Sequence, residues 1–158
     1  MDENLLDELQ QPEVAAALAE EGIHLPSGGD AVEQLAREYF DAFLGPGGTP
    51  LVQSLWDQGS YEGPSVTQIR EIARSAALEY ERSAVRNAPV DHLGSILLLW
   101  AELAETAPTK ATLLARHHLG FAARALQPVI RRGGFYGAVA DACRVLAIRI
   151  AAPSPDET

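Results

Sequence analysis

The sequence predicts an all-α fold, a single-domain helical bundle of about five long helices with one or two short ones. Apolar residues recur at helical spacing along most of the 158 residues, and no sustained alternation typical of a half-buried strand occurs. Glycine and proline interrupt this pattern at well-separated points. The length and the 47% hydrophobic content suit one core. We therefore expect one helical domain over residues 1–152 and a disordered tail over residues 153–158.

The N-terminal third predicts two helices. An acidic helix is expected over about residues 3–21, followed by a glycine-rich break. Asp30 and Glu33 have the spacing of a capping box, in which each side chain bonds to a backbone N–H near the start of a helix. They are expected to open a second helix over residues 31–44, and Gly45 and Pro46 are expected to end it.

The middle of the chain is predicted to form a long loop and a third helix. Glycine and proline crowd both ends of the loop, while a short helix is expected around Trp56. Ser65 and Gln68 repeat the capping-box spacing and are expected to begin a helix over residues 65–86. The apolar face of this helix comprises Val66, Ile69, Ala73, Ala76, Tyr80 and Ala84.

The C-terminal part predicts three further helices. The most apolar one is expected over residues 91–105, with Asp91 placed to cap it. A long basic helix is expected over about residues 110–132, with Pro128 producing a kink or an end because proline removes one backbone hydrogen bond. After two glycines, a last helix is expected over residues 135–151.

The net charge of −10 is unevenly distributed and excludes some partners. Residues 1–105 hold 19 acidic and 5 basic residues, and residues 106–158 hold 3 acidic and 7 basic residues, giving −14 and +4. Nucleic acid is not expected as a partner, because binding it requires a basic face. A cationic partner suits the acidic part, although an acidic surface also serves solubility alone.

The chain is expected to act in the cytoplasm. Its first thirty residues contain eight acidic residues and no Lys or Arg, unlike a signal peptide. No apolar run approaches the roughly 18 residues of a membrane span, so stable membrane insertion is not expected. The single cysteine, Cys143, forms no internal disulfide, which suits a reducing compartment.

Catalytic and metal-binding patterns are weak. Asp91 and His92 are adjacent, and neighbouring side chains on a helix diverge, so this Asp is not placed to orient this His. The four histidines show no metal-ligand spacing, and no serine lies in a nucleophile motif. We expect no metal, no cofactor and no enzymatic activity. A small enzyme that uses His92 or His117 as acid or base is the least favoured alternative.

Four segments in order resemble one known family. They are "YFDAFLGPGG", "SLWDQGSYEGPS", "APVDHL" and "RRGGFYGAVADACRVLA". Together they resemble the TorD/DmsD/NarJ family of cytoplasmic redox-enzyme maturation chaperones, over about residues 35–150. The most specific match is the proline, any residue, Asp-His pattern at Pro89, Asp91 and His92, and the Phe135-Tyr136 pair is a second match in the right order.

The resemblance implies an all-helical chaperone without enzymatic activity. Such a protein binds the catalytic subunit of a molybdopterin-dependent oxidoreductase, through its twin-arginine leader or N-terminal region, and assists cofactor insertion, folding and assembly before export. The partner is thus the molybdenum-containing catalytic subunit or its leader peptide. The chaperone itself is expected as a monomer or a homodimer, including a domain-swapped one. The alternative is a helical adaptor that binds another partner through the same surface.

The resemblance places client binding at Pro89, Asp91, His92 and Trp56, and Trp100 on the same predicted helix is added as a candidate. A twin-arginine leader combines guanidinium groups with an apolar run, so its receptor needs carboxylates beside an apolar groove. Asp91 directly before "LGSILLLW" supplies both. Asp91 is therefore interpreted as a helix cap, as a contact for an arginine, or as both.

Overall fold

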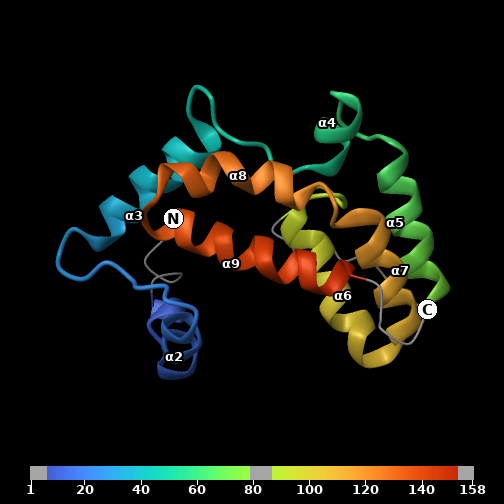
Figure 1. Cartoon of the computed structure of the whole chain (residues 1–158), viewed down its shortest axis with the longest axis horizontal. Helices are drawn as coiled ribbons and strands as arrows, with labels where there is room; N and C mark the ends of the chain where they lie inside the picture. The colour runs from blue at the N-terminus through green and yellow to red at the C-terminus, as the bar shows by residue number, and fades with distance from the viewer. Residues whose placement is uncertain (1–6, 79–86, 153–158) are drawn as a thin grey trace. The chain divides into compact units, whose positions relative to one another are not determined.

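The computed structural model describes residues 7–78 and 87–152 and confirms the all-α prediction (Figure 1). Within these residues no strand occurs, and the single β-bridge joins Val52 to His92. The helices are α2 (Pro12–Glu20), α3 (Ala31–Tyr39), the π-helix η1 (Phe40–Leu44), α4 (Gln53–Gln58), α5 (Pro64–Ser75), α6 (Leu93–Thr106), α7 (Pro108–His118), α8 (Ala122–Arg132) and α9 (Gly134–Ala151). No described helix is long and apolar enough to cross a membrane.

The contacts within the chain group it into two compact units. Unit 1 comprises Met1–Pro50 and Leu126–Cys143, and unit 2 comprises Leu51–Ala125 and Arg144–Thr158. Of the three points where the chain passes from one unit to the other, one follows Pro50 outside any helix, and the other two fall inside α8 and α9. The single domain predicted over residues 1–152 stays a prediction, and the tail predicted over residues 153–158 lies outside the described residues.

Unit 1 packs around Ile23, Leu35 and Phe135. A second layer of contacts is aromatic: the ring centroids of Tyr39 and Phe43 lie 5.1 Å apart, and each ring also meets Tyr136. Offset and edge-to-face aromatic pairs of this kind stabilise beyond the area that they bury. Phe135 and Tyr136, which stand out in the sequence, therefore serve the packing of this unit.

The N-terminal prediction needs two corrections. The helix expected over residues 3–21 is interrupted, because residues 7–9 are helical, a turn follows, and α2 begins only at Pro12. Proline is well tolerated in the first turn of a helix but does not continue one. In the second helix, α3 begins after Asp30 as expected, but the Asp30 side chain makes no capping hydrogen bond and the last turn widens into η1.

Unit 2 contains α4 to α7, and its described core includes Ile69, Ile96, Leu103 and Leu114, each fully buried. Helices α6 and α7 pack against each other, and α5 packs against α7 (Figure 1). The short helix expected around Trp56 is confirmed as α4. The sharp break expected after residue 105 is also confirmed, since Ala107 alone joins α6 to α7.

Helix α5 differs from its prediction at both ends. It begins at Pro64 after Gly63, so Ser65 lies in the first turn and is not the cap of a capping box. It ends at Ser75, far short of residue 86, and Ala77 then adopts a positive φ of 57°. The predicted positions Tyr80 and Ala84 lie outside the described residues.

The long basic helix predicted over residues 110–132 is two helices. Leu119 to Phe121 separate α7 from α8, and Gly120 lies at the break. Pro128 lies inside α8 and does not end it, contrary to one of the two expected outcomes. Gly133 and Gly134 both have a positive φ, which ends α8 as predicted and lets α9 begin in a new direction.

Candidate functional site

The turn that contains the Asp-His pair is joined to the start of α4. The backbone N–H of Gln53 donates to the carbonyl of Asp91 at 2.9 Å, and the N–H of Leu93 donates to the carbonyl of Leu51 at 2.8 Å. These two bonds form the bridge between Val52 and His92. We call residues 51–54 together with residues 89–93 the Asp91 corner.

The buried side chain of Asp91 stabilises this corner through hydrogen bonds. Its Oδ2 accepts hydrogen bonds from the backbone N–H of Ser54 at 2.9 Å, from the Ser54 hydroxyl at 2.5 Å and from the Ser65 hydroxyl at 3.1 Å. The residue is only 1% exposed. Ser54 lies in the first turn of α4, which has no capping side chain of its own. Asp91 therefore caps α4 from a distant part of the chain.

The prediction that Asp91 caps its own helix is wrong. Helix α6 begins at Leu93, and His92 is its cap, with Nδ1 accepting from the backbone N–H of Gly94 at 3.2 Å. Burial lowers the pKa of His92, and the neighbouring carboxylate of Asp91 opposes this effect in part. A lowered pKa favours the neutral imidazole, which is the form that can accept the capping bond.

A cavity of about 330 Å³, here called the Asp91 cavity, opens beside the corner. Asn87 to Asp91 line one side, and Tyr61, Glu62, Val66 and Arg70 line the rest. Among the described residues, Asp91 Oδ1 has no hydrogen-bond partner. Two lining residues, Glu62 and Asn87, adopt a positive φ of about 60°, which costs a side chain steric strain. Strained backbone of this kind often lies at functional sites.

The five predicted site residues are brought together only in part. Pro89 is exposed, and its carbonyl accepts from the N–H of His92 at 3.0 Å, so Pro89, Asp91 and His92 form one turn. Trp56 is half-buried on α4, the helix that Asp91 caps. Trp100 is half-buried on α6, eight residues after His92, which is about 12 Å along a helix axis. Their binding role stays a prediction.

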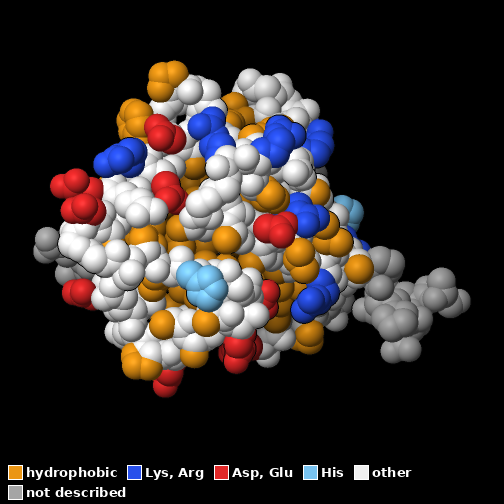
Figure 2. All heavy atoms as spheres, turned by 60° about the vertical axis from the view of Figure 1, so that its left-hand side comes forward, with side chains coloured by type: hydrophobic (Ala, Val, Ile, Leu, Met, Phe, Trp, Pro, Cys, Tyr) orange, Lys and Arg blue, Asp and Glu red, His pale blue; other side chains and the backbone are white. Residues whose placement is uncertain are grey.

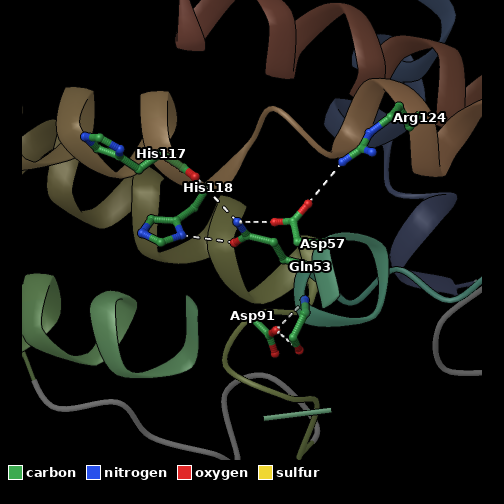
Figure 3. Close-up of polar contacts among 7 residues, drawn as sticks. Gln53, Asp57, Asp91, His117, His118 and Arg124 are labelled. Atoms are coloured by element: carbon green, nitrogen blue, oxygen red, sulfur yellow. Dashed lines mark hydrogen bonds and ion pairs between the residues drawn. The ribbon is translucent and has the colours of Figure 1, made fainter. Parts of the chain in front are cut away.

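A row of polar side chains begins on the same helix α4 (Figure 3). Arg124 donates to Asp57 Oδ1 at 3.0 Å, and Gln53 Nε2 donates to Asp57 Oδ2 at 3.1 Å. The Gln53 carbonyl oxygen in turn lies 3.0 Å from Nδ1 of His118. The helical pattern predicted no role for Gln53, Ser54 or His118, and it assigned to Ser65 only the opening of a helix. In the sequence, the indication for these residues was only that they are polar and stand near a helix start or on a helix face that becomes buried.

Reactive and metal-binding groups are sparse within the described ranges. There, no three His, Cys, Asp or Glu side chains gather closely enough to hold a metal ion. The Cys143 thiol is half-buried, and burial raises its pKa. A raised pKa keeps the thiol protonated and poorly nucleophilic. On the face shown in Figure 2, acidic and basic side chains both lie among exposed apolar ones, so its surface is mixed in charge.

Comparison with protein families gives one match. The model of the nitrate reductase delta subunit family matches residues 3–128. The matched range includes the Asp91 corner but begins earlier and ends earlier than the expected 35–150, so the Phe135-Tyr136 pair lies outside it. No curated protein and no solved structure matches significantly.

The match confirms the resemblance stated from the sequence. The family is of the NarJ/TorD type, whose members are redox-enzyme maturation factors and not catalysts, and which bind the catalytic subunits of molybdoenzymes. The matched range covers 126 of the 158 residues. The chain therefore belongs to the nitrate reductase delta subunit family of redox-enzyme maturation chaperones.

Proposed function

We propose that this chaperone binds the leader or N-terminal region of a molybdopterin-dependent oxidoreductase's catalytic subunit, and that the Asp91 corner contributes the binding site. The observation that carries the proposal is the Asp91 cavity, which lies against the proline, any residue, Asp-His turn. The bound segment is held while the client receives its cofactor, folds and assembles before export. Binding in the cytoplasm follows from this role.

The lining of the cavity suits a segment that is both apolar and rich in N–H donors. Tyr61, Val66 and Pro89 offer apolar surface, and Tyr61 is 63% exposed. Asp91 lines the cavity, and its buried Oδ1 lacks a partner among the described residues. A buried carboxylate oxygen without a partner is costly, and a donor from the client would remove that cost.

Asp91 thus has two oxygens with different tasks. Oδ2 is occupied by the donors of Ser54 and Ser65, which shape the corner. Oδ1 is the oxygen that we assign to the client, with an arginine guanidinium as its best partner. His92 contributes by fixing the start of α6, while Trp56 and Trp100 are proposed as further apolar contacts.

The substitution Asp91→Asn separates the two tasks. The asparagine oxygen can still accept from Ser54 and Ser65, whereas its amide places a donor where the client's donor would bind. We expect binding of the catalytic subunit encoded by a neighbouring gene, measured by calorimetry, to weaken at least about tenfold while the fold is retained. The control is Glu102→Gln, which removes an exposed carboxylate from α6.

Unchanged client binding and maturation in Asp91→Asn and His92→Ala would remove the proposed site. The helical adaptor is the second candidate, because the same cavity could receive a polypeptide that is not a molybdoenzyme. Capture of the neighbouring reductase subunit by the full-length chaperone favours the first candidate. Failure to bind that subunit, together with stable binding of another identified protein, favours the adaptor.

A further inference from the structure

A second cavity, here called the α5–α7 cavity, lies within unit 2 and has a volume of about 430 Å³. Residues of α5 form one wall and residues of α7 form the other. Helix α5 therefore contributes residues to this cavity and to the Asp91 cavity. The lining includes Gln68, Glu71, Ile72, Ser75, Leu113 and His118.

The buried imidazole of His118 lines the cavity, and its hydrogen bonds fix a single tautomer. Gln53 Nε2 donates to Asp57 Oδ2 and to the carbonyl of His117, and both of these atoms are acceptors only. Gln53 must therefore turn its carbonyl oxygen toward His118, so that His118 Nδ1 carries the hydrogen and donates across 3.0 Å. The polar row thus determines the tautomer of His118.

The other ring nitrogen, Nε2, is then an acceptor. Figure 3 shows it on the side of the His118 ring away from Gln53. Burial, with the charge of His117 as a smaller contribution, lowers the pKa of His118 to about 4. The imidazole is therefore neutral near pH 7, and its Nε2 keeps a lone pair. His118 is only 1% exposed, so this lone pair is nearly shut off from bulk water.

The rest of the lining adds acceptors and apolar surface. Glu71 supplies a carboxylate, and the amide oxygen of Gln68 is a further acceptor on the same helix. Ile72 and Leu113 supply the apolar surface, and Leu113 is 46% exposed.

One basic side chain beside the cavity, Lys110, is already engaged. The ammonium group of Lys110 donates to the backbone carbonyl of Ser75 at the end of α5. A ligand that fits the cavity therefore has several N–H donors, a positive charge and an apolar stem.

We propose that the α5–α7 cavity is a subsite for an arginine side chain of a bound polypeptide. The guanidinium is planar, carries five N–H donors and keeps its charge, so it can bridge the Glu71 carboxylate and Nε2 of His118. Its aliphatic stem packs on Ile72 and Leu113. Lysine fits less well, because its charge is compact and strongly hydrated. The inference rests on the proposed binding of an arginine-bearing client segment.

The test uses the full-length protein and a synthetic peptide with two adjacent arginines before a run of leucine and alanine. Nitrogen NMR of the histidine rings reports on His118 Nε2, and calorimetry gives the Kd. We expect the peptide to shift the Nε2 resonance of His118, and a peptide with citrulline at both positions to leave it unchanged. Glu71→Gln should weaken binding of the arginine peptide about tenfold, and Glu102→Gln should not weaken it.

Three results would overturn the subsite: no binding of the arginine peptide, an unmoved Nε2 resonance on binding, or equal affinity in Glu71→Gln and the wild type. The last two leave the proposed function intact, because the peptide still binds elsewhere. Conversely, a shift of the His118 resonance that is abolished by Glu71→Gln supports the subsite. If Asp91→Asn at the same time loses no client binding, the Asp91 corner is rejected as the client site.

Discussion

Asp91 Oδ2 accepts a hydrogen bond from the backbone N–H of Ser54 at 2.9 Å, although 37 residues separate the two in the chain. The same oxygen accepts from the Ser54 hydroxyl at 2.5 Å. One buried carboxylate thereby caps α4 and anchors the turn before α6. The motif residue with the strongest resemblance to client-binding chaperones is thus also a structural centre of unit 2.

Asp91→Ala should destabilise the protein strongly. Removing the carboxylate leaves the Ser54 N–H and the hydroxyls of Ser54 and Ser65 without their buried acceptor. Each orphaned donor costs about 1 to 3 kcal/mol, so we expect a loss of about 3 kcal/mol or more in the free energy of unfolding. Urea denaturation measures it. Asp91→Asn keeps an acceptor and should lose about 1 kcal/mol, and equal losses in the two variants would contradict the hydrogen-bond explanation.

His92→Ala should remove the cap of α6 at a cost of about 1 kcal/mol. The reason is that His92 Nδ1 satisfies the N–H of Gly94, which lies in the first turn and has no partner within the helix. Thermal unfolding of the two proteins gives the difference. His92→Ser and His92→Asn should restore most of the stability, since both side chains cap well. A loss in those variants as large as in His92→Ala would show that capping is not the role of His92.

The stability should fall as the pH is lowered from 6.5 toward 4. His118 has a pKa of about 4 in the folded protein and an ordinary value of 6.5. Between these values the unfolded chain binds the proton more tightly, so protonation favours unfolding, and the stabilisation present above pH 6.5 is lost on acidification. The difference corresponds to at most about 3 kcal/mol. Denaturation at pH 7, 5 and 4 measures the slope.

His118→Gln is the control for this pH dependence. Glutamine can still donate to the Gln53 oxygen but does not titrate, so the stability of this variant should depend less on pH between 6.5 and 4. The pKa of His118 can also be read directly from the ring resonances during an NMR titration. A measured pKa near 6.5 would contradict the burial argument for His118.

Gly134→Ala should destabilise more than Gly133→Ala. Both glycines have a φ above 70°, so both substitutions carry a cost of about 1 kcal/mol for a side chain in the left-handed region. Only at Gly134 would the added Cβ lie 2.6 Å from Glu38 Oε2, the atom that accepts from the Phe135 N–H at 2.9 Å. No atom lies within 4 Å of a Cβ at Gly133. We expect a difference of about 1 kcal/mol or more, by urea denaturation. Equal losses would mean that Glu38 moves away at little cost.

Most of the helical architecture could be predicted from the sequence, whereas several helix ends and caps could not. The apolar period, with the glycines and prolines, predicted the all-α class, α4 around Trp56, the break at Ala107 and α9. The predictions failed where a helix was extended through a weak signal, as at Gly120 and beyond Ser75. A single glycine or alanine does not end a helix by itself, because packing of the neighbouring segments decides whether the helix continues.

The sequence by itself determined the fold class, the acidic character of residues 1–105 and the Pro89-to-His92 pattern through which the chain resembles its family. Only the tertiary structure decided what the polar side chains do. Asp91 caps α4 and not α6, and Gln53 sets the tautomer of His118 across 65 residues. Periodicity reports which face of a helix is buried, whereas the partner of a buried polar group depends on which distant segment packs there.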